Sequence, residues 1–253
     1  PGNPDGAYKM AQLVRANQAL YDITTAYGVP CISGKDSMKN DSIRGGVRIS
    51  IPPTVLFSTL GMIDDINRCV TLGWKRPGDL IYVLGVTHDE LGASAYHRVL
   101  ALDAGEPGSI GGSPPHLDAA LALGVYRGHN QATAEGSFQS SHTPTQGGLA
   151  VGLALCCLAG GLGAEVHLGD LPVGEALKDD ALLFSESNSR FVVTCQPENE
   201  AKLQRQLAGL PFACIGSVAD TDSLRIHGAR GKLVIDSKLR RLRRAFQETL
   251  HGQ

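Results

Sequence analysis

Residues 146–168, QGGLAVGLALCCLAGGLGAEVHL, contain an apolar run between two glycine pairs, followed at once by a second apolar segment. The small and aliphatic residues at 149–159 are typical of a helix that is buried on all sides. Gly160 and Gly161 end this helix, because glycine favours helix C-termini, and residues 164–168 have the length and composition of a strand. The stretch therefore predicts a buried helix that packs on a sheet.

Segments with helical or strand periodicity occur along the whole chain, but they do not alternate regularly as in a βαβ fold. Further helices are predicted at residues 5–27, 95–102, 117–128, 198–207 and 238–250. Further strands are predicted at residues 29–32, 47–51, 54–63, 79–86, 191–195, 212–218, 224–227 and 233–235. We therefore expect an α+β protein with layered helices and a mixed sheet.

The turn-rich segment 74–79, which contains Arg76, Pro77 and Gly78, predicts a boundary between two parts of the chain. We expect a first domain at residues 1–75 and a second at residues 76–253.

Composition excludes several classes of function. The 253 residues are 42% hydrophobic, which is enough for a substantial core, and the net charge of −2 gives no general attraction to nucleic acid or anionic membranes. No apolar run is long enough to span a bilayer, and the start of the sequence lacks a basic-then-apolar signal segment. We expect a cytoplasmic protein that binds neither nucleic acid nor membrane.

The polar loop at residues 33–40, SGKDSMKN, follows the predicted strand 29–32 and is the first candidate binding site. Gly34 lets backbone N–H groups approach anionic oxygens and Lys35 supplies a cation, so the loop suits phosphate. It lacks the GxxxxGK[ST] pattern of P-loop proteins, and an ordinary polar surface loop is the alternative.

Gly147 and Gly148 form a second candidate phosphate site. A double glycine at a helix start exposes backbone N–H donors, and the helix dipole adds partial positive charge. In the alternative, the two glycines only allow the helix to pack closely on the sheet.

The segment 183–190, LFSESNSR, is a third candidate site. Glu186 is suited to hydrogen-bond a ribose or an amide substrate, and Arg190 is suited to bind a phosphate. In the alternative, these two side chains pair with each other and order the turn before the strand at 191–195.

Five segments in the same order resemble the second synthetase module of the phosphoribosylformylglycinamidine synthase family, of the PurM-like (AIR synthase-related) superfamily. They are SGKDSMKND, IPPTVLFSTLGMI, KRPGDLIYVLGVTHDELGASAY, QGGLAVGLALCCLAGGLGAEVHL and LFSESNSRF, and the resemblance covers nearly the whole chain. It implies a partial PurM-like N-terminal αβ domain and a layered PurM-like C-terminal domain.

The resemblance also implies an ATP-dependent ligase of purine biosynthesis. In this family, ATP with Mg²⁺ activates the amide of formylglycinamide ribonucleotide, and ammonia from a glutaminase subunit or domain gives the amidine; a paired synthetase module is a further partner. By resemblance, Gly34 and Lys35 are near the ATP phosphates, Ser37 is near the substrate, and Asp36 is a magnesium ligand or a loop-ordering residue. The resemblance assigns no acid or base.

Residues 142–148, HTPTQGG, depart from the family pattern, which resembles HDxSDGG and supplies acidic residues for magnesium. The sequence also lacks the first strands of the module, so we expect part of a longer polypeptide that has no synthetase activity alone. One alternative is a structural module that supports a catalytic twin, with an auxiliary nucleotide or none. Another is a different chemistry of the superfamily, such as that of aminoimidazole ribonucleotide synthetase, selenophosphate synthetase or thiamine-monophosphate kinase.

Overall fold

The computed structural model describes residues 6–35, 37, 40–50 and 53–248, and it divides the chain into two units, Pro1–Asp64 (unit 1) and Asp65–Gln253 (unit 2). The assignment of residues 1–75 and 76–253 to two domains stays a prediction. No helix among the described residues combines the length and the apolar character that a membrane-spanning segment requires.

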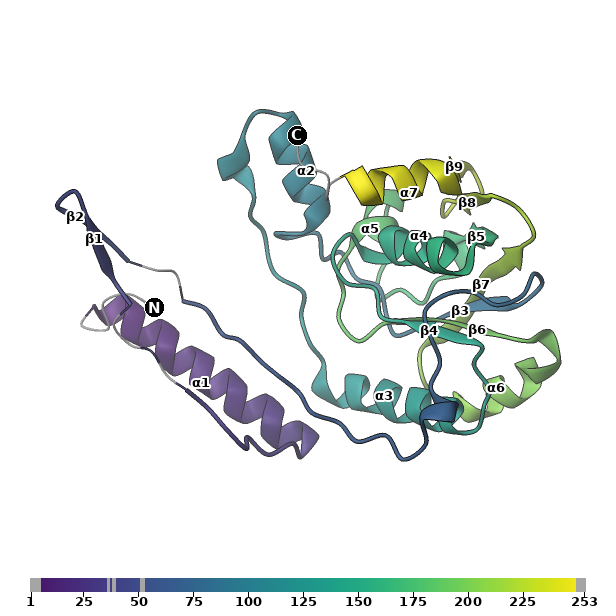
Figure 1. Cartoon of the computed structure of the whole chain (residues 1–253), viewed down its shortest axis with the longest axis horizontal. Helices are drawn as coiled ribbons and strands as arrows, with labels where there is room; N and C mark the ends of the chain where they lie inside the picture. Colours follow the sequence, from purple (N-terminus) through teal and green to yellow (C-terminus); the bar gives the residue numbers. More distant parts are fainter. Residues whose placement is uncertain (1–5, 36, 38–39, 51–52, 249–253) are drawn as a thin grey trace. The chain divides into compact units, whose positions relative to one another are not determined.

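Unit 1 contains one long helix and one hairpin (Figure 1). The predicted first helix is confirmed as α1, Ala7–Tyr27, and it ends at Gly28, whose left-handed φ of 66° allows its N–H and that of Val29 to bond to the last helical carbonyls. The hairpin pairs β1, Ser42–Arg44, with β2, Val47–Ile49. Gly45 and Gly46, which both have positive φ, form its turn.

The prediction of strands at residues 29–32 and 54–63 is wrong for the described part of the chain. The described part of both segments has no regular secondary structure and is exposed to solvent; Leu56 is 90% exposed and Met62 93%. In the described part of unit 1, β1 and β2 pair only with each other. An apolar run becomes a strand only when it pairs with a neighbouring strand, and the described residues of these two segments belong to neither sheet.

Unit 2 is built around a seven-stranded sheet with the order β4-β6-β3-β7-β5-β8-β9. The strands are β3 (Leu80–Leu84), β4 (Ser140–His142), β5 (Gly163–His167), β6 (Phe191–Cys195), β7 (Phe212–Ala219), β8 (Ser223–His227) and β9 (Leu233–Lys238). β5 and β8 are parallel and the other neighbours are antiparallel. The predicted mixed sheet is therefore confirmed.

Helices cover both faces of this sheet (Figure 1). The α-helices in the described part of unit 2 are α2 (Ala95–Asp103), α3 (Ala119–Ala134), α4 (Gly148–Gly160), α5 (Asp179–Phe184), α6 (Glu200–Gln206) and α7 (Leu239–Glu248). α4, α5 and α7 lie on one face, and α3 and α6 lie on the other. The layered α+β fold predicted from the sequence is therefore confirmed.

β3 shows why an apolar run of strand length belongs at the centre of such a sheet. Ile81 and Val83 pack in the hydrophobic cluster under α4, whereas Tyr82 and Leu84 pack in the cluster under α3. Successive side chains of a strand point to opposite faces, so a strand with helices on both sides needs apolar residues at every position.

The buried helix predicted from residues 149–159 is confirmed as α4. Leu149, Leu153 and Cys157 are fully buried. A Cβ on Gly160 would lie 2.7 Å from the backbone nitrogen of Trp74, so only glycine allows this close approach, and Gly161 with φ of 70° ends the helix. The glycine pair therefore has a packing role as well as a capping role.

Candidate functional site

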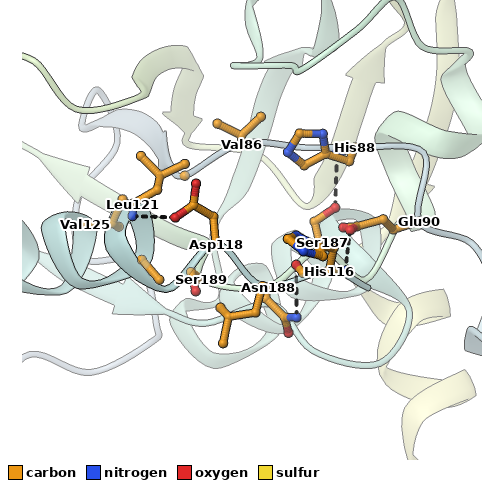
Figure 2. A pocket seen from close by; sticks show the side chains of 13 residues that line it. Val86, His88, Glu90, His116, Asp118, Leu121, Val125, Ser187, Asn188 and Ser189 are labelled. Carbon is orange, nitrogen blue, oxygen red and sulfur yellow. Dashed lines mark hydrogen bonds between the residues drawn. The ribbon is translucent and has the colours of Figure 1, made fainter. Parts of the chain in front are cut away.

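A cavity of about 210 Å³ opens in unit 2 where β3 ends (Figure 2). Gly85 and Val86 line it directly after the strand, and Leu121 and Val125 line it from the first half of α3. The segment 187–189, immediately before β6, contributes Ser187, Asn188 and Ser189. β3 and β6 are antiparallel neighbours, so the end of one and the start of the other meet at the same edge of the sheet.

Hydrogen bonds hold the polar side of the cavity in place. Oε1 of Glu90 accepts from the backbone N–H of His116 at 2.6 Å, and the Ser187 hydroxyl accepts from the backbone N–H of His88 at 3.1 Å. The Asn188 amide donates to the carbonyl of His116 at 3.4 Å. Three segments that are distant in sequence are therefore tied together around the opening (Figure 2).

The opposite side of the cavity is formed at the start of α3. Asp118 is the N-cap of this helix, and its Oδ1 accepts from the backbone N–H groups of Ala120 and Leu121 at 3.0 Å each. This contact satisfies two of the donors that every helix N-terminus leaves unpaired.

Ser189 lines the cavity with a left-handed backbone, φ 60°, which is uncommon for a residue other than glycine. Its hydroxyl is 2.7 Å from the Tyr126 hydroxyl of α3. Opposite it, a Cβ on Gly85 would lie 2.5 Å from the Ser189 carbonyl oxygen, so glycine is required there. The two backbones therefore approach more closely than side chains would allow.

The Arg190 side chain lies behind the cavity and is only 1% exposed. Its guanidinium donates to the Thr87 hydroxyl at 2.9 Å, to the Ser185 carbonyl at 2.5 Å and to the Ser187 carbonyl at 3.1 Å. Burial lowers the pKa of Arg190 to about 10, and the nearby Glu90 carboxylate opposes that shift. Arg190 therefore remains charged at neutral pH and orders the loop before β6.

The Glu186 carboxylate joins two helix N-termini. Its Oε1 accepts from the backbone N–H of Ala95, the first residue of α2, and from that of Gly147, the residue before α4, each at 2.9 Å. A Cβ on Gly148 would lie 2.6 Å from the Ser185 carbonyl oxygen, so glycine at this position lets the segment carrying Glu186 approach α4 closely. A protein carboxylate thus occupies a position that suits an anion.

The three sequence-predicted sites lie in different places. Gly34, Lys35 and Ser37 belong to unit 1, where all three are exposed and the Lys35 ammonium donates to the Ser37 hydroxyl at 3.0 Å. Asp36 lies outside the described residues. Gly147, Gly148, Glu186 and Arg190 belong to unit 2, where Glu186 and Gly147 are brought together by the hydrogen bond described above. The binding roles of these residues stay predictions.

Sequence reasoning missed Glu90, His116 and Asp118. Signals existed for two of them: Glu90 lies in the polar segment after an apolar strand, and Asp118 directly precedes a helix, where aspartate is a preferred N-cap. Neither signal shows that the segment of Glu90 and the segment of Asp118 lie close together. That contact depends on the fold, in which residues 187–189 lie beside both segments.

Residues 142–148 do not fit the magnesium ion that the resemblance implies. They offer an imidazole, hydroxyls and an amide, whereas Mg²⁺ prefers carboxylate oxygens, and the carboxylate nearest the glycine pair, Glu186, is already bonded to backbone N–H groups. Among the described residues, no cluster of three or more His, Cys, Asp or Glu side chains is arranged to hold a metal.

The family model "AIR synthase related protein, C-terminal domain" matches residues 76–229, and the chain belongs to this family. Its curated relatives include phosphoribosylformylglycinamidine synthase subunits PurL. The PurL of Beijerinckia indica is 35% identical over 98% of this chain and 31% of its own length, and that of Thermobifida fusca is 36% identical over 98% and 30%. The resemblance seen in the sequence is thereby confirmed. The chain spans about a third of the length of these relatives.

Solved structures support the fold. The structure of PurLQS from Thermotoga maritima matches 87% of this chain and 34% of its own with a TM-score of 0.63 and 19% identity. Thermotoga maritima PurL complexed with FGAR matches 70% of this chain and 30% of its own with a TM-score of 0.62 and 20% identity. At these identities the likeness concerns the fold alone.

Proposed function

We propose that this chain is the second synthetase module of a phosphoribosylformylglycinamidine synthase. The enzyme would convert formylglycinamide ribonucleotide to formylglycinamidine ribonucleotide with ATP and glutamine-derived ammonia. The observation that carries the proposal is the similarity to PurL of about 35% over 98% of this chain. Solved structures of Thermotoga maritima PurL complexed with ATP and with FGAR add support for the two substrates.

The chemical task of such an enzyme is phosphoryl transfer to a poorly reactive amide oxygen, which then leaves as phosphate when ammonia attacks. Catalysis of that kind depends on positioning the substrates and on stabilising charge on the transferred group. We assign Lys35 the role of a cation near the ATP phosphates, Gly34 that of a close backbone approach, and Ser37 a contact to the ribonucleotide. Asp36 is the proposed ligand of Mg²⁺.

The proposed partners are a paired synthetase module and a glutaminase. The name PurLQS of one similar structure supports an assembly with further subunits. Unit 1 adds an observation of its own, because the apolar side chains of Leu56, Leu60 and Met62 are about 90% exposed. A run of exposed apolar side chains marks an interaction surface, and we assign it to the paired module. A cytoplasmic location is part of the same proposal.

A non-catalytic supporting module is the second candidate function. It is favoured by the absence of carboxylates from residues 142–148 and by the Glu186 carboxylate at the start of α4. Under this proposal the module stabilises its catalytic twin and activates no substrate.

Substitution of Lys35 and of Ser37 by alanine in the complete synthetase separates the two candidates. We expect kcat to fall at least about tenfold in both variants with an unchanged unfolding midpoint, because Lys35→Ala removes a charge contact to the transferring phosphoryl group and Ser37→Ala removes a contact that positions the ribonucleotide; a tenfold loss corresponds to about 1.4 kcal/mol of transition-state stabilisation. Lys232→Ala, at an exposed position of unit 2, is the matched control. Full turnover in both variants would establish the supporting role instead.

A further inference from the structure

The outer side of α4 is apolar and is left partly open by the described residues. Apart from two cysteines, this helix contains only glycine, alanine, valine and leucine. Its inner side is buried, but Val151 is 41% exposed, and Leu155 and Leu158 are half-buried. These three residues are four and three positions apart, so they form one ridge along the helix. A helix that is apolar on every side is normally buried on every side, so the ridge suits a partner.

The ridge lines a groove between α4 and α7, which lie side by side on the same face of the sheet (Figure 1). This α4–α7 groove has a volume of about 330 Å³. Every described side chain that lines it is apolar, including Phe184 of α5 and Leu242 and Phe246 of α7. Ordered water needs polar partners, so solvent alone fills such a groove unfavourably.

The lining favours the side chains of a protein over a small metabolite. Sites for small molecules combine apolar walls with a few polar groups that fix the orientation of the ligand, and the described lining contributes no such group. Two helices border the groove, and a further helix can pack between them with side chains that are three and four positions apart. The groove therefore fits the apolar face of an amphipathic helix.

α7 gives the groove a basic border. The helix contains four arginines and one glutamate. Arg243 is four residues after Leu239 and three before Phe246, so it lies beside the apolar stripe of α7. Among the described residues, only Arg244 of the four arginines pairs with a carboxylate, that of Glu248. Acidic side chains that flank the apolar face of a partner would therefore be attracted to this border.

A second copy of this chain fits the groove less well. A two-fold contact centred on the groove brings the same surface of both copies together. The arginines of one α7 would then lie close to those of the other, and like charges repel across an interface. The charge of α7 thus favours a different protein over self-association.

We propose that the α4–α7 groove binds a helix of a partner protein. The apolar stripe of that helix lies in the groove, and its acidic side chains lie toward the arginines of α7. The surface belongs to unit 2 and is separate from the exposed apolar run at Leu56, Leu60 and Met62 of unit 1. It stands independently of the synthetase reaction proposed above.

Fluorescence anisotropy of a labelled synthetic peptide, titrated with the full chain, tests the groove. The peptide is a helix of about 18 residues with leucines three and four positions apart and with glutamate and alanine elsewhere. We expect saturable binding with a Kd in the micromolar range, and a Kd about tenfold weaker for Val151→Gln, which places an amide in the groove. Val173→Gln, at a valine that is 43% exposed and outside the lining, is the matched control.

Two further arms test the remaining features of the groove. Phe246→Ala, at an exposed side chain of the lining, should also weaken binding about tenfold, which covers the case in which Val151→Gln unfolds. Replacement of Arg240, Arg241 and Arg243 together by glutamate should weaken binding of the acidic peptide at least about tenfold and strengthen binding of a peptide with lysine in place of glutamate. Opposite changes for the two peptides cannot result from a lost fold.

The proposal is overturned if the acidic peptide gives no saturable signal, if the lysine peptide binds the unchanged chain as tightly, or if the folded Val151 and Phe246 variants both bind as well as Val173→Gln. Sedimentation equilibrium and binding to phosphatidylserine vesicles test the other occupants. Dimerisation of the chain, or binding to the vesicles, that Val151→Gln abolishes would assign the groove to a second copy or to a membrane instead.

Discussion

Oε1 of Glu186 lies 2.9 Å from the backbone nitrogen of Gly147 and accepts its hydrogen bond at the point where α4 begins. The same oxygen accepts from Ala95 at the start of α2, so one carboxylate fixes the relative position of two helices and the loop before β6. The negative charge also lies at the positive ends of two helix dipoles, where it is stabilised.

Replacement of Glu186 by alanine should therefore lower the free energy of unfolding by about 1.5–3 kcal/mol, the usual value for a hydrogen bond to a charged group. Urea unfolding measures the loss, and Glu106→Ala, at an exposed glutamate after α2, should change stability by less than about 0.5 kcal/mol. Equal stabilities of the two variants would contradict the bridging role.

The Glu186→Ala variant also tests the phosphate site predicted at Gly147 and Gly148. Once the carboxylate is gone, the N–H of Gly147 is available at a helix N-terminus, and an anion can take its place. We expect inorganic phosphate to raise the unfolding midpoint of the variant and to leave that of the unchanged chain unaffected. A phosphate effect of equal size in both would show that the anion binds elsewhere.

Two glycine substitutions separate backbone strain from steric overlap. Gly148 and Gly136 have similar left-handed φ values of 62° and 70°, but only at Gly148 would an added Cβ meet a backbone atom, the Ser185 oxygen at 2.6 Å. Gly136→Ala should cost about 1–2 kcal/mol for the strain alone, and Gly148→Ala about 1–3 kcal/mol more. Thermal or urea unfolding of the pair measures the difference; equal losses would refute the close packing described.

Arg190→Ala should destabilise unit 2 by about 3–5 kcal/mol, because it leaves the Ser185 and Ser187 carbonyls and the Glu90 carboxylate without their cation. Arg127→Ala, at an exposed position on α3, is the matched control and should be close to neutral. The comparison is made by urea unfolding. A loss below about 1 kcal/mol for Arg190→Ala would show that water replaces the guanidinium.

His129 should make stability depend on pH. Burial lowers its pKa to about 4 from 6.5, while its ring stacks on Phe191 and its Nε2 lies 2.7 Å from the Ser141 hydroxyl. The unfolded chain therefore binds a proton on His129 more readily, so its contribution is present above pH 6.5 and is lost as the pH falls toward 4.

We expect the free energy of unfolding to drop by about 2 kcal/mol between pH 7 and pH 5 through His129, a drop that His129→Gln abolishes. Urea unfolding at the two pH values measures it, with His97→Gln on α2 as the control. If the His129 variant keeps the full pH dependence of the unchanged chain, another group is responsible.

The pattern of apolar residues predicted most strands of unit 2. A strand that is buried on both faces of a sheet has apolar residues at successive positions, and such a run is visible in the sequence. β6, Phe191–Cys195, was predicted to the residue. The short β4, Ser140–His142, was missed because its signal is polar: Ser140 is buried, yet its hydroxyl bonds to Thr194 on β6 instead of packing against apolar atoms. α5 was missed because its six residues are too few to show helical periodicity.

The site was less predictable than the fold. Glu186 was singled out from the sequence as a ligand-binding residue, but its protein partners Ala95 and Gly147 come from segments far apart in the chain. The cavity beside β3 likewise forms where three segments meet. Contacts of this kind join residues that are distant in the sequence and close only in the folded protein. Neither the spacing of residues nor the composition predicts them.

The order of strands in the sheet has a consequence for biosynthesis. β3 is the first strand of unit 2 to leave the ribosome, yet its two neighbours, β6 and β7, begin only at Phe191 and Phe212. During translation the nascent chain therefore carries an unpaired apolar strand until most of the unit has been synthesised. Until residue 219 has been synthesised, this strand cannot pair with both of its neighbours and is exposed to aggregation.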